Sequence, residues 1–137
     1  MEEKKDEKDF KELKEELSEL FEARKFLKIK EIITSMNEVD TAELLESIDE
    51  EMAVMIFRLI PKEQAAEVFA YMEHDLQESI ITTITDSELH NIINELFLDD
   101  TVDLLEEMPA NAVNRILKHT DSKTRQAINR LLKYPED

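Results

Sequence analysis

The sequence predicts an all-α fold, a superhelical solenoid of short helix pairs with a 24-residue repeat. The 137-residue chain has no glycine, which disfavours β-hairpins because their tight turns depend on Asn-Gly or Asp-Gly. Apolar residues recur every 24 positions after residue 36, in six columns whose 24 members include 22 apolar residues. The columns are Leu44, Val68, Ile92, Ile116; Leu45, Phe69, Ile93, Leu117; Ile48, Met72, Leu96, Thr120; Ile56, Ile80, Leu104, Ile128; Phe57, Ile81, Leu105, Asn129; and Ile60, Ile84, Met108, Leu132.

Each 24-residue unit is predicted to form two helices. The first three columns are spaced i, i+1, i+4, as are the last three, which is typical of one apolar helix face followed by a second. Polar residues or proline stand between these faces, where helices begin. Helices of about 8–10 residues are unstable alone, so we expect them to stack on their neighbours. The expected breaks are Asp49-Glu50, Pro61, Thr85-Asp86-Ser87, Pro109 and His119–Ser122.

Two further helices are expected ahead of the repeats. The first is amphipathic and spans Asp9–Glu22, and the second carries apolar residues from Phe26 to Met36. We therefore predict N-terminal capping helices in 1–36, four helical-pair repeats in 37–132 and a closing linker in 133–137.

Acidic residues are concentrated in the middle of the chain. The net charge is −17, and residues 37–108 contain 20 acidic residues against Arg58 and Lys62, a formal charge of −18. Such a block attracts cations or basic surfaces and argues against nucleic-acid binding. Solubility alone is the competing explanation.

The sequence offers little for catalysis. Its three histidines, His74, His90 and His119, have no metal-ligand spacing, and Gly-rich phosphate loops are impossible without glycine. There is no cysteine and no apolar run of about 20 residues that could span a membrane. We therefore predict a soluble binding domain rather than an enzyme.

Carboxylates gather at Asp99, Asp100 and Asp103. Asp99 and Asp103 are spaced i, i+4 and share one helix face, and Asp100 is i, i+3 from Asp103. An acidic first turn that complements the helix dipole explains Asp99 and Asp100, but explains Asp103 less well. Mg²⁺ prefers oxygen ligands and takes one or two carboxylates with several waters. A partial divalent-cation site, completed by a second acidic surface, is the alternative explanation.

Several segments resemble the N-terminal domain of MgtE magnesium transporters. They are Thr41–Asp49 (TAELLESID), Phe57–Phe69 (FRLIPKEQAAEVF), Leu98-Asp99-Asp100 with Asp103-Leu104-Leu105, and Tyr134–Asp137 (YPED). The resemblance covers residues from about 10 to 137. Asn37-Glu38 departs from the His-Pro usual in the family, at an expected helix start.

The resemblance implies a cytosolic regulatory domain that docks on CBS domains of the same polypeptide through bound Mg²⁺ and favours the closed pore. It implies Glu67, Asp99 and Asp103 as metal ligands, with Asp100 a weaker candidate, and a linker at 133–137 toward a missing CBS domain. It also implies a homodimeric full-length protein on the cytoplasmic side of the cell membrane, attached through a missing transmembrane domain. The alternative is a helical-repeat adaptor, like HEAT proteins or the flagellar switch protein FliG, without specific metal sensing.

Overall fold

The protein is all-helical, as the sequence predicts. The computed structural model describes the backbone of residues 2–133 and the side chains of residues 10–131, and that part of the chain forms ten α-helices and no strand. The helices are α1 Glu2–Glu22, α2 Phe26–Thr34, α3 Glu38–Ser47, α4 Glu50–Phe57, α5 Lys62–Ala70, α6 His74–Thr83, α7 Asp86–Glu95, α8 Leu98–Glu107, α9 Ala110–Lys118 and α10 Ser122–Lys133.

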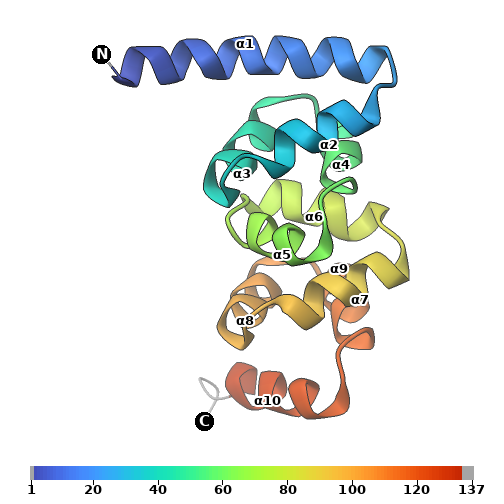
Figure 1. Ribbon diagram of the computed structural model, residues 1–137. Helices are drawn as coiled ribbons and strands as arrows, with labels where there is room; N and C mark the ends of the chain where they lie inside the picture. Colours follow the sequence, from blue (N-terminus) through green and yellow to red (C-terminus); the bar gives the residue numbers. More distant parts are fainter. Residues whose placement is uncertain (1, 134–137) are drawn as a thin grey trace.

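The helix pairs follow one another along an elongated array, with α1 at one end and α10 at the other (Figure 1). The first helices of successive pairs begin at residues 38, 62, 86 and 110, and the second helices begin at 50, 74, 98 and 122. Both series have the 24-residue spacing of the apolar columns. No helix within residues 2–133 is long and apolar enough to cross a membrane.

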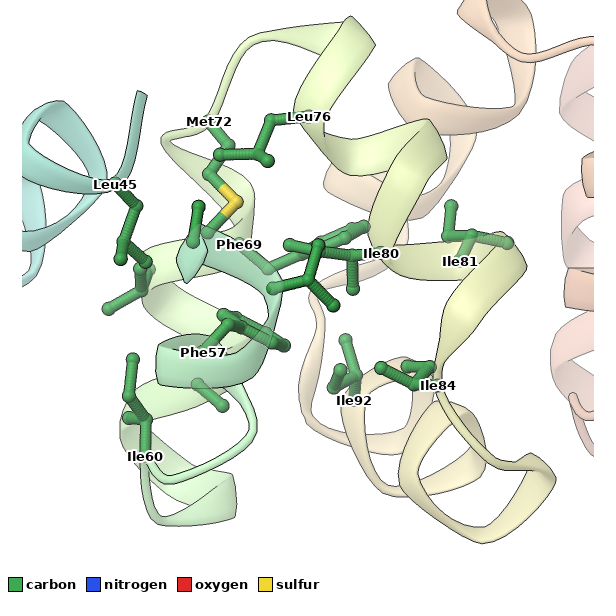
Figure 2. Close-up of a cluster of buried hydrophobic side chains, with 14 of the residues drawn as sticks. Leu45, Phe57, Ile60, Phe69, Met72, Leu76, Ile80, Ile81, Ile84 and Ile92 are labelled. Carbon is green, nitrogen blue, oxygen red and sulfur yellow. The ribbon is translucent and has the colours of Figure 1, made fainter. Parts of the chain in front are cut away.

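One apolar core continues through the stack, from Leu17 of α1 to Ile128 of α10. Its centre lies where α4, α5 and α6 meet, and Phe57, Phe69 and Ile80 converge there (Figure 2). The rings of Phe57 and Phe69 lie 6.2 Å apart between centroids. Because each helix buries its apolar face against neighbouring pairs, the stack supplies the stability that the isolated short helices lack.

The two polar members of the apolar columns behave differently. Thr120 is buried, and its hydroxyl donates a 2.8 Å hydrogen bond to the carbonyl oxygen of Leu117. Asn129 is exposed on α10. Thr120 can therefore be buried like the apolar residues of its column, because its hydroxyl has a hydrogen-bond partner nearby. Asn129 lies on the surface instead.

Four helix starts, those of α3, α4, α7 and α10, carry a side-chain cap. Asn37 Oδ1 accepts a 2.8 Å bond from the Asp40 amide, so the departure at this position gives α3 an ordinary N-cap. Asp49 caps α4, and Thr85 forms a reciprocal capping box with Glu88 at α7.

Pro61 and Pro109 also stand at helix starts, but they occupy the N-cap position, one residue before the first helical residue. Both have an extended backbone there, and each carbonyl accepts the first amide bond of its helix. A proline lacks an amide proton, so it loses nothing at a position where that group would lie outside the helix.

The N-terminal pair differs in length from the prediction. The first helix begins at Glu2 rather than Asp9, and the second ends at Thr34. Between them Arg24 adopts a left-handed backbone with φ of 59°. The Lys25 amide donates to the Leu20 carbonyl and the Arg24 amide donates to the Phe21 carbonyl, which is the Schellman pattern. Because the chain has no glycine, an arginine adopts this left-handed conformation, which costs about 1–2 kcal/mol more for arginine than it would for glycine.

Arg58 and Arg115 tie distant helices together. Arg58, at the end of α4, donates two hydrogen bonds of 3.1 and 2.9 Å to Glu88 on α7. Arg115, on α9, donates to the carbonyl oxygens of Ile81 and Ile84 at the end of α6, and to Asp86 Oδ1 at 2.8 Å. Arg115 thus satisfies carbonyls at a helix end that has no continuing partner.

These contacts shift the ionisation of the acids. The hydrogen bond from Arg115 holds the pKa of Asp86 below its ordinary value, and the charges of His119 and Arg115 act in the same direction. Burial raises the pKa of Glu88, but hydrogen bonds from Arg58 and Thr85 outweigh burial and leave it lowered.

The pair of Asp86 and Arg115 gives a pH-dependent prediction. A carboxyl whose pKa is lowered by folding stabilises the protein above its unfolded pKa, about 4, and that contribution disappears as the pH falls through the folded value. The stability difference between the protein and an Asp86→Asn variant should therefore be largest near pH 6 and shrink toward pH 2. Urea denaturation across this range measures it, and a difference that stays constant with pH would show that the ionised pair contributes nothing.

The predicted division into 1–36, 37–132 and 133–137 stays a prediction. Its last segment lies mostly outside the described residues, because only the backbone of Lys133 is described there.

Candidate functional site

α8 presents a stripe of carboxylates along one helix. Asp99 and Asp100 lie in its first turn, where the helix dipole favours negative charge. Asp103 lies one turn further on and is exposed, as is Asp99, whereas Asp100 is half-buried. On the opposite side Thr101, Leu104 and Leu105 are buried and hold α8 to the core. The repeat therefore supplies a rigid helix, and α8 carries its acids on the side that the core does not use.

A hollow of about 290 Å³ lies beside this stripe, which we call the acidic hollow. It is bounded by the end of α5, the start of α6 and the length of α8. The described residues that line it include no lysine or arginine. They are Phe69, Ala70, Met72, His74, Gln77, Leu96, Asp100, Asp103, Leu104, Glu106 and Glu107.

One polar contact joins α6 to α8 across the acidic hollow, and others join α6 to the end of α5. The Nε2 atom of His74 lies 3.8 Å from a carboxylate oxygen of Glu107, and its Nδ1 atom lies 3.0 Å from the Oε1 atom of Gln77. Gln77 is buried and donates to the Phe69 carbonyl at 2.8 Å. This chain of contacts fixes the α6 wall against the end of α5.

Glu67 lies on α5 and is exposed, while its neighbours Ala66 and Val68 are buried. It precedes Ala70 by three residues, so the two share a helix face, and Ala70 lines the acidic hollow. Glu67 therefore stands one helical turn from the hollow without lining it.

Lysine and arginine are rare in this part of the sequence. Arg58 is one of two bases in residues 37–108, and it is engaged by Glu88 on the α4–α7 contact. Dissolved salt screens exposed charges from one another only beyond about 8–10 Å. Carboxylates that lie closer together therefore repel one another unless a basic side chain lies between them. The carboxylates of α8 therefore favour any cation that approaches them.

The donor chemistry fits Mg²⁺, but the donors do not converge. Carboxylate oxygens are the hard ligands that Mg²⁺ prefers, and one or two of them with waters suffice for a typical site. Within the part of the chain whose side chains are described, no group of three or more acidic or histidine side chains could hold a metal ion by itself. The residues therefore fit a partial site, which a facing surface would have to complete.

The predicted metal ligands differ in their position relative to the acidic hollow. Asp103 lines the acidic hollow together with Asp100, which the sequence ranked as the weaker candidate, whereas Asp99 and Glu67 are exposed outside it. His74 and Glu107 were not singled out as site residues. The i, i+4 spacing of Asp103 and Glu107 could have indicated the second of these.

Comparisons with known proteins agree with this architecture. The family model for the MgtE intracellular N domain matches residues 36–137. The structure resembles a crystal structure of the cytosolic domain of the Mg²⁺ channel MgtE in complex with ATP, with 26% identity and a TM-score of 0.74 over 85% of this chain and 48% of that one.

It also shares the fold of the soluble part of a magnesium transporter, with 19% identity and a TM-score of 0.75 over 91% of this chain and 50% of that one. The chain thus spans about half the length of both solved structures. No curated protein matches it significantly. Because the family model covers most of the sequence, the chain belongs to the MgtE intracellular N domain family.

Proposed function

We propose that this chain is the cytosolic magnesium-sensing domain of a Mg²⁺ channel or transporter, acting by binding rather than by catalysis. In the proposed full-length protein, a homodimer, the domain docks on CBS domains of the same polypeptide through Mg²⁺ and favours the closed pore. The observation that carries the proposal is the stripe of carboxylates on α8, beside a hollow whose α8 side includes Asp100, Asp103, Glu106 and Glu107. Membership of the MgtE N domain family supports it.

Glu67, Asp99 and Asp103 are the residues we propose as ligands, with Asp100 a further candidate beside Asp103 in the acidic hollow. They are exposed or half-buried, so a facing surface can reach them. The residues of this chain supply oxygen atoms, and a rigid helix fixes the spacing between those on α8. When bound, Mg²⁺ supplies positive charge and further coordination positions for oxygens of the facing surface.

The carboxylates also explain how docking would respond to magnesium. Without a divalent cation, the acids of α8 repel a second acidic surface and the undocked arrangement is favoured. Binding at a shared site favours the docked arrangement, because a ligand shifts a population toward the state that binds it more tightly. The domain would then leave the CBS domains when magnesium falls.

Calorimetric titration tests the shared site. Mg²⁺ is titrated into this chain, into the CBS domains and into an equimolar mixture at fixed ionic strength. We expect weak binding to this chain alone, because its donors do not converge, and additional, tighter binding in the mixture. A mixture that merely sums the two separate titrations would contradict the proposal and favour the adaptor alternative.

A further inference from the structure

Gln77 determines which ring nitrogen of His74 carries a proton. Gln77 is 5% exposed, and its side-chain amide donates a 2.8 Å hydrogen bond to the carbonyl oxygen of Phe69. Because a carbonyl oxygen can only accept, the NH₂ group of Gln77 must face Phe69 and its Oε1 atom must face His74. Oε1 can also only accept, so the Nδ1 atom of His74, 3.0 Å away, must donate to it. The neutral imidazole therefore carries its proton on Nδ1 and leaves Nε2 bare.

The bare nitrogen of His74 lies opposite a carboxylate. Nε2 is 3.8 Å from the Oε1 atom of Glu107, across the acidic hollow. While the imidazole is neutral, both of these atoms offer lone pairs and no hydrogen bond can join them. A proton on Nε2 converts the contact into an ion pair between α6 and α8. Both side chains are more than half exposed, so water can deliver that proton.

The charged side chains on the elements packed around His74 are mostly acids. They are Asp100, Asp103, Glu106 and Glu107 of α8, Asp75 and Glu78 of α6, Glu73 before α6, Glu46 of α3, Glu50 of α4 and Glu67 of α5. The bases lie further off, because Lys62 begins α5 at the end away from the hollow. Arg115 and Lys118 of α9 lie near Asp86, beyond the far end of α6. Among the described residues that line the hollow, His74 alone can therefore acquire a positive charge.

We propose that a proton on His74 competes with the divalent cation for the acidic hollow, so that magnesium-dependent docking weakens as the pH falls. This inference rests on the proposed function, in which Asp103, with Asp100 beside it, binds the cation. A protonated imidazole pairs with Glu107 and places a positive charge on the wall that faces α8, so the hollow attracts a second cation less strongly. The coupling is reciprocal, because a bound cation disfavours the proton by the same free energy.

The pH range of the effect follows from the chemistry of the two kinds of group. Imidazole is the side chain that ordinarily changes charge between pH 5 and 8, whereas carboxyl groups, whose ordinary pKa is about 4, are ionised above pH 6. A change of affinity between pH 8 and pH 6 therefore reports on imidazole rather than on carboxylates. Proton binding opposes cation binding, so docking should be stronger at pH 8 than at pH 6.

Nitrogen-15 NMR of the ring nitrogens tests the starting point in this chain alone. At pH 8 we expect His74 to carry its proton on Nδ1 and to leave Nε2 bare, as the hydrogen bond to Gln77 requires. A neutral ring protonated on Nε2 would overturn the inference, because no lone pair would then face Glu107.

Association with the CBS domains at constant Mg²⁺ and ionic strength, compared at pH 8 and pH 6, tests the competition. Between these values the unmodified chain should lose about two- to fivefold more affinity than His74→Gln, the size expected for a pair of exposed charges. Glutamine takes up no proton but can still donate to Gln77. His90→Gln is the matched control, because His90 lies on α7, outside the lining of the hollow, and its Nδ1 atom is 3.1 Å from the His119 carbonyl oxygen. That variant should lose as much affinity as the unmodified chain.

The outcomes separate this inference from the proposed function. Groups of the CBS domains that titrate affect all three chains alike. Mg²⁺-dependent association whose loss at pH 6 is the same in the unmodified chain and in His74→Gln overturns the competition alone. Association of the unmodified chain that ignores Mg²⁺ at pH 8 overturns the proposed function and the competition together.

Discussion

Replacing both Asp99 and Asp103 with asparagine is expected to weaken Mg²⁺-dependent association with the CBS domains by about 10–100-fold, the loss that follows when groups supporting a metal site are removed. Both side chains are exposed on one face of α8. Asparagine keeps their shape but removes the charge that binds the cation. Stability should change by less than about 1 kcal/mol, because only the helix-dipole contribution of Asp99 is lost.

The matched control changes the net charge equally. Glu12 and Glu16 are also exposed and spaced i, i+4, but they lie on α1, outside the family match. Their double replacement by glutamine should leave association unchanged in the same assay. Equal losses in the two double variants would mean that net charge alone governs association and that α8 holds no specific site.

Phe69→Ala is expected to lower the free energy of unfolding by about 3–5 kcal/mol, the range for truncating a buried phenylalanine. Phe69 is 1% exposed at the centre of the stack, where its ring packs against Phe57. Because each pair of helices is stabilised by its neighbours, a cavity here should weaken the packing on both sides of α5.

Urea denaturation followed by circular dichroism measures this loss. Leu27→Ala provides the control, since an exposed side chain should change stability by no more than about 0.5 kcal/mol. A loss below about 1 kcal/mol for Phe69→Ala would contradict the continuous core that the structure places through α4, α5 and α6.

The apolar columns explain why the sequence predicts so much of the fold. An i, i+1, i+4 stripe has a physical meaning only on a helix, and two stripes within 24 residues leave room for two short helices. Cap signals then mark the boundaries where a polar side chain is needed to satisfy an amide, as at Asn37 and Thr85. Residues close together in the sequence therefore determine where each helix forms and which of its faces is apolar.

Two boundaries lack a conventional signal. α7 ends and α8 begins at Leu96-Phe97, where no polar residue caps the helix, and α5 gives way to α6 at Tyr71-Met72-Glu73. At these places the position in the repeat, rather than the local residues, determines the break. The extension of α1 to Glu2 was missed for a different reason. Its apolar face begins only at Phe10, and charged residues alone give no periodic signal, although pairs such as Glu7 and Lys11 favour a helix.

The sequence predicts the carboxylates of the candidate site, but not the residues of other helices that line the acidic hollow beside them. Asp100 and Asp103 stand out in the sequence because the residues 24 positions away in the other repeats are uncharged. His74 and Gln77 come from a different unit and adjoin α8 only through the stacking of helices. The exposure of Phe97 was not predicted because an aromatic residue inside an apolar sequence resembles core.

The most direct test of magnesium-dependent docking is the association of this chain with the CBS domains as MgCl₂ replaces NaCl at constant ionic strength, followed by sedimentation velocity. The proposed function predicts saturable association that appears only with Mg²⁺ and is lost when Glu67, Asp99 and Asp103 are replaced by their amides. Association that is equally strong in NaCl, or that follows ionic strength alone, would contradict it and leave an acidic helical scaffold without metal sensing.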